Sequence, residues 1–237
     1  MKKMLLAGCS HSVGFGLDNV EDSWGNIFAK NNGYELTNVS VAASSLQYSI
    51  HAIIDKIAKE HFDVIVFQLT TLDRYPISYN GDARFLNDNI LKVDENKRDV
   101  FHLVPANYLE AVNGGKLPVK AENIRFFYED VMYSNFYLNA IINEIHILQE
   151  LLKCKGVDFI LIPYDDYFWG YESFMNIWKL EQSSKIDKTR YVDYPFMKWL
   201  KDNHNPNDYY IDNGFHLNLE GHKLFAEQYL PSFIKVD

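Results

Sequence analysis

Hydrophobic and polar positions along the first 70 residues predict strands and helices in alternation. Residues 3–8 form a short apolar run that ends in glycine, and residues 34–39 and 63–69 form two further strand candidates. The last of these, DVIVFQL, is almost continuously apolar, which is typical of a strand covered on both faces. Apolar residues at helical spacing over residues 24–31 and 50–57 separate the strands. This β-α-β-α-β order predicts a parallel sheet with crossover helices.

The second half of the chain returns to the same rhythm after an interruption. Residues 74–122 show little periodicity and mix Pro, Gly, Asn and charged residues, so they predict an insertion or lid. An apolar stripe over residues 132–152 predicts a long helix, and residues 157–163 predict a fourth strand. A final helix is expected over residues 219–229. No repeat or linker divides the chain, so we expect a single domain over residues 1–237.

The composition narrows the class of protein. Of the 237 residues, 47% are hydrophobic and 23% are charged, which is an ordinary globular balance. The net charge of −9 and the scattered basic residues argue against nucleic acid or an anionic membrane as the partner. No run reaches the roughly 18 apolar residues of a membrane span. The apolar stretch before Cys9 is shorter than the roughly 7–15 residues of a signal segment, so we expect a cytoplasmic protein.

Four polar segments carry the candidate chemistry. Three follow predicted strands, where ligands of open parallel sheets bind, and the fourth precedes the last helix. They are residues 8–14 (GCSHSVG), 38–45 (NVSVAASS), 68–74 (QLTTLDR) and 212–222 (DNGFHLNLEGH). The first segment lacks the residues of a phosphate loop or a dinucleotide fingerprint. A nucleophilic serine needs a base and an acid that orients it, and His216 with a nearby carboxylate supplies both.

In this order the four segments resemble the motif blocks of the SGNH/GDSL hydrolase family. Gly8-Cys9-Ser10 matches the family's Gly-Asp-Ser with Cys in place of Asp, and Asn38 to Ala43 matches Asn-x-x-x-x-Gly with Ala in place of Gly. The third block, Gly-x-Asn-Asp, corresponds to Gln68-Leu69-Thr70-Thr71. The last block, Asp-x-x-His, matches at His216 and is followed by Gly221-His222. The chain looks closest to a divergent branch with Gly-x-Ser-His in its first block.

The resemblance implies both a fold and an activity. The fold would be a three-layer α/β/α sandwich around a flavodoxin-like parallel sheet of about five strands. The activity would be that of a serine-dependent carboxylic ester hydrolase without a cofactor or metal, acting on a small acyl ester such as an O-acetyl group on a sugar or glycan. Two alternatives stay open: an O-acyltransferase that uses the same site, and a catalytically impaired domain that binds a glycan or a protein.

The resemblance also assigns catalytic roles. Ser10 would be the nucleophile and His216 its base. The position three residues before His216, where the family has Asp, is Asn213 here. The acid is therefore expected to be Asp212, one residue further back, with Asn213 as the alternative orienting group.

An oxyanion hole and a substrate-binding set follow from the same comparison. The backbone N–H groups of Ser10 and Ala43 would serve unchanged, and the Thr70 hydroxyl would replace the family's Asn side chain. The expected substrate-binding residues are His11, Arg74, Tyr167 and Trp169. His11 would point away from Ser10 if the backbone were extended there. Asp165-Asp166 comes without a histidine pattern, so we expect no metal site.

Overall fold

A four-stranded parallel sheet forms the centre of the protein. The computed structural model describes residues 1–72, 74–79, 99–103, 113–114, 121–132, 134–163, 180–211 and 216–234. The strands lie in the order β2-β1-β3-β6. Their bounds are β1 (Lys2–Ala7), β2 (Tyr34–Asn38), β3 (Val64–Leu69) and β6 (Asp158–Pro163). A single parallel bridge from Tyr191 to Leu161 extends the sheet beyond β6. The predicted parallel sheet and its strand positions are confirmed.

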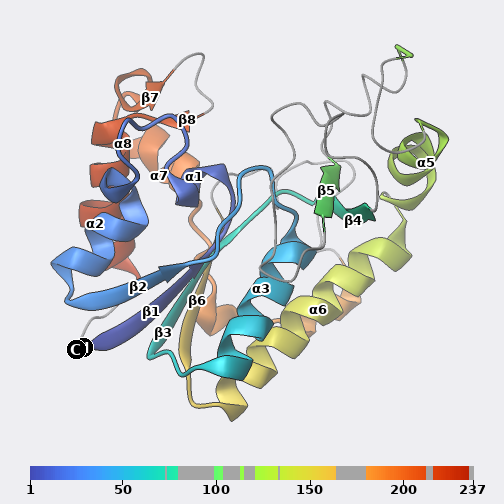
Figure 1. Cartoon of the computed structure of the whole chain (residues 1–237), viewed down its shortest axis with the longest axis horizontal. Coiled ribbons are helices and arrows are strands. Elements are labelled where there is room, and N and C mark those ends of the chain that lie inside the picture. The colour runs from blue at the N-terminus through green and yellow to red at the C-terminus, as the bar shows by residue number, and fades with distance from the viewer. Residues whose placement is uncertain are drawn as a thin grey trace.

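Helices cover both faces of this sheet, so the predicted three-layer sandwich is confirmed (Figure 1). One face carries α2 (Trp24–Asn31), α7 (Phe196–Asn203) and α8 (Leu219–Leu224), with a π-helical turn over Phe225–Tyr229 after α8. The other face carries α3 (Leu46–Lys59) and α6 (Asn135–Cys154).

Each strand supplies side chains to both layers, because successive residues of a strand point to opposite faces. In β1, Leu5 and Ala7 pack in the core beneath α3 and α6, whereas Met4 and Leu6 pack beneath α2 and α8. All six residues of β3 are buried. The continuous apolar run over this strand is therefore explained by burial on both faces.

The shorter elements lie around the carboxyl end of the sheet and beyond it. They are α1 (Ser10–Val13), β4 (Tyr75–Tyr79), β5 (Asp99–Leu103), α5 (Ala121–Phe126), β7 (Tyr210–Ile211) and β8 (His216–Leu217). The antiparallel pair β4–β5 falls within residues 74–122, the segment that we predicted to be an insertion or lid. That role stays a prediction.

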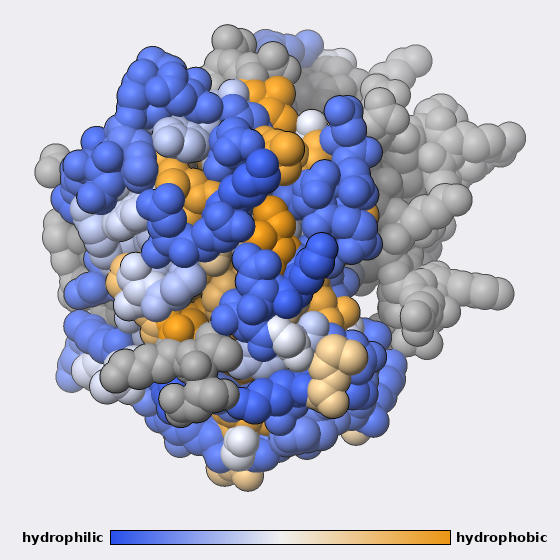
Figure 2. Space-filling model, turned by 90° about the vertical axis from the view of Figure 1, so that its left-hand side faces the viewer, coloured by the Kyte–Doolittle hydropathy of each residue, from blue (hydrophilic) through white to orange (hydrophobic). Residues whose placement is uncertain are grey.

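The face that carries α2 and α8 is mostly hydrophilic, with narrow strips of hydrophobic side chains between the polar ones (Figure 2). Within the ranges given above, no helix is long and apolar enough to cross a lipid bilayer.

Candidate active site

Ser10 and His216 meet at the carboxyl end of the sheet, although 206 positions separate them in the sequence. Ser10 is the first residue of α1, directly beyond β1, and His216 begins β8, just before α8. The distance from Ser10 Oγ to His216 Nε2 is 3.1 Å, within hydrogen-bond reach. Ser10 is buried and His216 is half-buried.

Polar contacts with the neighbouring strands hold α1 in place. Gln68, a fully buried residue of β3, contacts both flanks of Ser10: its Oε1 accepts a hydrogen bond from the Ser12 hydroxyl, and its amide lies 3.8 Å from Cys9 Sγ. Asn38 at the end of β2 donates to the Ser12 carbonyl at 2.9 Å. A Cβ at Gly8 would collide with the Ser12 and Gln68 side chains, so glycine is required there.

The loop around His216 is fixed by the helix that follows it. The Asn218 side chain accepts a hydrogen bond from the Gly221 N–H at 2.9 Å and so caps α8. A Cβ at Gly221 would meet the Tyr209 carbonyl, which explains the glycine at this position. The Phe15 ring packs on the imidazole with centroids 4.8 Å apart.

His11 lies inside the site, contrary to our expectation for an extended chain. The backbone is helical from Ser10 to Val13, which turns the His11 ring to within 5.1 Å of the His216 ring, centroid to centroid. Burial, together with the nearby His216, Arg74 and His222, lowers the pKa of His11 well below its usual value. His11 is therefore a neutral imidazole at neutral pH.

Two effects also favour the neutral form of His216. Burial lowers its pKa, and the positive charge of Arg74 lowers it further. A neutral imidazole can accept a proton from Ser10, so the ring is in the right state to act as a base.

The loop after β2 folds onto the loop after β1. Gly8 anchors it, since its carbonyl accepts from the Val41 N–H at 3.2 Å and from the Ser44 hydroxyl at 2.8 Å. Ala43 has φ +60°, the only positive value for a non-glycine residue in the described part of the chain. This is the position where the motif block calls for glycine, and its left-handed backbone explains why.

Ala43→Gly is expected to raise the free energy of unfolding by up to about 1 kcal/mol. Alanine loses roughly 1–2 kcal/mol in a left-handed conformation, and the more flexible unfolded glycine chain offsets part of that gain. Urea unfolding would measure the change. Ala42→Gly is the matched control, because Ala42 lacks a positive φ and should lose about 0.4–1 kcal/mol. If both variants change the free energy of unfolding in the same direction, the backbone at Ala43 is not strained.

Three polar atoms in the segment after β3 are buried without a hydrogen-bond partner among the described residues. They are the hydroxyl oxygens of Thr70 and Thr71 and the Nη1 atom of Arg74. Thr70 is 2% exposed. Ala7 of β1 pairs with Phe67 of the neighbouring strand β3. Ser10 lies three residues after Ala7, and Thr70 lies three residues after Phe67, so both follow the same end of the sheet. The segment therefore places polar groups without a partner among the described residues at the carboxyl end of the sheet, where Ser10 also lies.

His222 has a structural role that the Gly-His motif did not reveal. Its Nδ1 accepts a hydrogen bond from the Trp24 N–H at 3.1 Å, at the first turn of α2. Only 1% of the residue is exposed. Burial, and to a lesser extent the charge of His216, lowers its pKa to about 4.

Acid is expected to destabilise the protein through His222. The folded-state pKa lies below the ordinary histidine value near 6.5, so the unfolded chain binds the proton first as the pH falls. The contribution is complete above about pH 6.5 and is lost towards pH 4, roughly 3 kcal/mol over the window. Urea unfolding at pH 7 and 4.5 should show a weaker pH dependence for His222→Gln, whose amide oxygen can still accept from Trp24. The same dependence in both proteins would exclude this role.

Four predicted site residues lie outside the described residues: Asp212, Asn213, Tyr167 and Trp169. The Asp165-Asp166 pair, for which no site was expected, also lies outside them. Among the residues that are described, no group of three or more His, Cys, Asp or Glu side chains is arranged to hold a metal ion.

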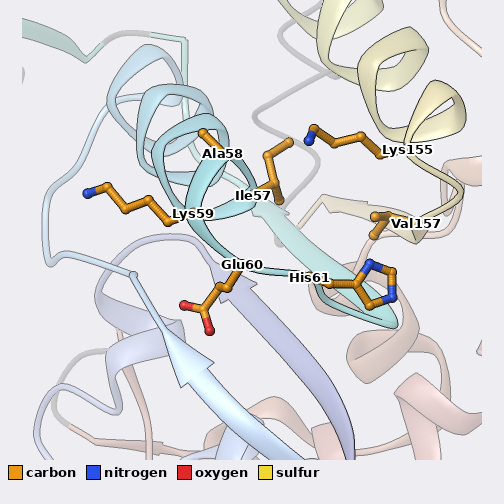
Figure 3. Close-up of a pocket in the computed structure, with 7 residues that line it drawn as sticks. All are labelled: Ile57, Ala58, Lys59, Glu60, His61, Lys155 and Val157. Carbon is orange, nitrogen blue, oxygen red and sulfur yellow. The ribbon is translucent and has the colours of Figure 1, made fainter.

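A pocket lies at the end of the sheet where the strands begin (Figure 3). It lies between the end of α3 and the start of β6, and its lining includes Glu60, His61 and Lys155. Glu60 is paired there with Lys3 at 3.3 Å. The pocket is therefore at the amino ends of the strands, away from Ser10.

Sequence reasoning gave no role to Phe15 or Gln68. Phe15 lies between Gly14 and Gly16, both with positive φ, and is 54% exposed although it packs on His216. An aromatic residue between two glycines just after the serine was the available signal. For Gln68 no local signal existed, because its contacts join β3 to the segment after β1, which is far away in the sequence.

Comparison with known proteins identifies the fold. No family model matches the sequence, and no curated protein matches it significantly. Among solved structures, the chain is similar to the psychrotrophic esterase EstA from Pseudoalteromonas sp. (9% identity, 98% of this chain and 96% of that chain, TM-score 0.55). It is also similar to the acetylxylan esterase Axe2 from Geobacillus stearothermophilus, solved as a catalytic mutant (12% identity, 99% of this chain and 95% of that chain, TM-score 0.52). A third similar structure is that of a lipolytic protein of the G-D-S-L family from Veillonella parvula (12% identity, 98% of this chain and 98% of that chain, TM-score 0.51). These similarities extend over nearly the whole chain and show a shared fold.

Proposed function

We propose that this chain, which has the fold of the SGNH/GDSL hydrolases, is a serine-dependent carboxylic ester hydrolase. The observation that carries the proposal is the 3.1 Å approach of Ser10 Oγ to His216 Nε2 at the carboxyl end of the parallel sheet. This is the edge where ligands of such sheets bind. A serine and a neutral histidine within hydrogen-bond distance are the nucleophile and base of acyl transfer.

The reaction would proceed in two steps. Ser10 Oγ attacks the acyl carbonyl while His216 Nε2 takes the hydroxyl proton, and the same proton then passes to the leaving alcohol oxygen. The C–O bond of the ester breaks and an acyl-Ser10 ester remains. Water then attacks this ester, gives a proton to His216, and releases the carboxylic acid as Ser10 recovers its proton.

A polar side chain must orient and stabilise the imidazolium that forms in each step, because burial and Arg74 both oppose that charge. We assign this role to Asp212, with Asn213 as the alternative. Asp212→Ala and Asn213→Ala, assayed side by side, distinguish them. A larger loss of kcat in Asn213→Ala would overturn the assignment to Asp212.

Developing negative charge on the substrate oxygen would be stabilised by three donors. The N–H of Ser10 belongs to the first turn of α1, where helix N–H groups have no partner within the helix. The N–H of Ala43 comes from the turn anchored on Gly8. The hydroxyl of Thr70 is the third donor.

The proposed substrate is a small acyl ester, such as an O-acetyl group on a sugar or glycan. Support comes from a structural neighbour that is an acetylxylan esterase. Tyr167 and Trp169 would stack on the sugar, and His11 and Arg74 would contact the polar groups of the substrate. An acyl transferase would use the same residues and differ in accepting a sugar hydroxyl in place of water.

A fluorophosphonate probe tests the proposal, because it reacts covalently with activated serines. We expect labelling of the wild type at Ser10, located by mass spectrometry, and none in Ser10→Ala. Ser49→Ala is the matched control and should be labelled like the wild type, since Ser49 is a buried serine of α3 whose hydroxyl donates to the Ser45 carbonyl. A protein that neither reacts with the probe nor hydrolyses p-nitrophenyl acetate faster than Ser10→Ala is not a serine hydrolase, and a glycan-binding domain would then be the better explanation.

A further inference from the structure

Arg74 carries a positive charge in the segment that follows β3, at the end of the sheet where Ser10 lies. Its Nη1 atom is shielded from water and has no hydrogen-bond partner among the described residues. Thr71, three residues earlier, has a buried hydroxyl in the same condition. Two separate side chains of one short segment therefore have unused hydrogen-bonding capacity.

The backbone that carries these groups is held in a defined position. The Tyr137 hydroxyl of α6 contacts the carbonyls of Leu72 and Arg74 at 3.2 and 3.4 Å. The Tyr75 ring packs against Phe127 and Tyr137, with centroids 5.0 and 6.2 Å apart. The Arg74 backbone is therefore held by the contact of its own carbonyl with Tyr137 and by the packing of the Tyr75 ring that follows it.

Leaving such groups without a partner is energetically unfavourable. A buried polar atom without a hydrogen bond costs about 1–3 kcal/mol, and a charged group costs more. Buried guanidinium groups in proteins are usually paired with carboxylate or phosphate, which match their planar donors. The ligand chemistry that best fits these two groups is therefore that of an anion.

The position of the charge connects this anion to the reaction. Arg74 lowers the pKa of both His216 and His11, so its field reaches the catalytic base. The positive charge of Arg74 opposes the imidazolium that forms on His216 when Ser10 attacks. A bound anion on Arg74 would cancel this effect as the substrate enters the site.

We propose that the ester substrate carries a carboxylate group that binds Arg74 and the Thr71 hydroxyl. This inference rests on the proposed esterase function and narrows its substrate class to acidic esters. The carboxylate can belong to the acyl part or to the alcohol part of the ester, since both lie close to Ser10 during attack. The chemistry of recognition is the same in the two cases.

A pair of substrates that differ in one charge tests the acyl side. The mono-p-nitrophenyl ester of succinic acid and p-nitrophenyl butyrate have the same chain length and leaving group. We expect the ratio of their kcat/KM values, acidic over neutral, to fall about 10–100-fold in Arg74→Gln, the amount that a charged hydrogen bond contributes. The assay at pH 8 keeps His216 neutral in both proteins, so a shift of its pKa does not affect the ratio.

Arg190→Gln is the matched control. Arg190 pairs with Asp158 at the beginning of β6, at the opposite edge of the sheet, and its replacement removes the same unit of charge. We expect it to leave the ratio unchanged. An equal fall in both variants would mean that net charge, and not a binding site, sets the preference.

The alcohol side is tested with acetyl lactate and its neutral methyl ester. An Arg74-dependent preference for the acidic member of either pair supports the inference, and its absence in both pairs overturns it. Ser10-dependent hydrolysis of p-nitrophenyl butyrate with no such preference would sink the acidic substrate and leave the esterase function standing. If the protein hydrolyses none of these esters, calorimetry with succinate decides: binding to the wild type but not to Arg74→Gln supports the anion site, and equal binding or none overturns it.

Discussion

Replacing Ser10 and His216 together by alanine is expected to slow ester hydrolysis no more than replacing either residue alone. Each single change should lower kcat/KM on the order of 10⁴-fold or more. The effects are not additive because the two residues act in one step: without the base the serine is a poor nucleophile, and without the serine the base has no proton to accept. The hydrogen bond between Ser10 Oγ and His216 Nε2 is the structural reason for expecting this coupling.

Steady-state hydrolysis of p-nitrophenyl acetate by the four proteins of this double-mutant cycle measures the coupling. His51→Ala is the control for loss of a histidine, since His51 is exposed on α3 and belongs to the opposite layer. It should retain wild-type activity. Two outcomes would contradict a catalytic pair. One is a double mutant whose loss of kcat/KM equals the product of the two single losses, and the other is a His216→Ala enzyme whose kcat/KM stays within about 10-fold of wild type.

Thr70→Val is expected to lower kcat by about 10²–10³-fold while making the folded protein more stable. The Thr70 hydroxyl would donate to the oxyanion only in the transition state, so its loss should affect kcat far more than KM. In the free protein the same hydroxyl is buried without a partner among the described residues, and valine of similar shape removes that cost of about 1–3 kcal/mol. Activity and stability therefore change in opposite directions.

Kinetics and urea unfolding of the same preparations measure both changes. Thr70→Ser keeps the hydroxyl and should keep most of the activity, which separates the donor from the shape of the side chain. A Thr70→Val protein that loses stability together with activity would point to a packing role. One that keeps full activity would exclude Thr70 from the oxyanion hole.

Much of the fold was predictable because its signals are local. The β-branched run that becomes β3 and the apolar stripe of α6 record burial on the faces of a strand and a helix, and both patterns can be read within a short window. The final helix was predictable for the same reason, and its cap at Asn218 acts on the residues directly after it. The motif blocks indicated Ser10 and His216 as partners, and the structure places them within hydrogen-bond distance.

The surroundings of the pair were less predictable, because they depend on contacts between segments far apart in the chain. His11 was expected to turn away, but the helical start of α1 brings its ring against His216. His222 was noted only as part of the Gly-His pair after the last motif block, whereas in the structure its ring accepts a hydrogen bond from the first turn of α2. Neither outcome has a signal in the residues next to it.

The sequence by itself determined the order of strands and helices along the chain, the end of the sheet where the proposed site lies, and the serine and histidine that are proposed to act there. These depend on periodicity and on residue type at given spacings. The tertiary structure alone decided which polar groups find partners and which do not. Burial and distance between remote residues favour the neutral state of His216. They also leave Thr70, Thr71 and Arg74 each with a buried polar atom that has no partner among the described residues. Those unused groups, and not the motif, are what point to the charge of the substrate.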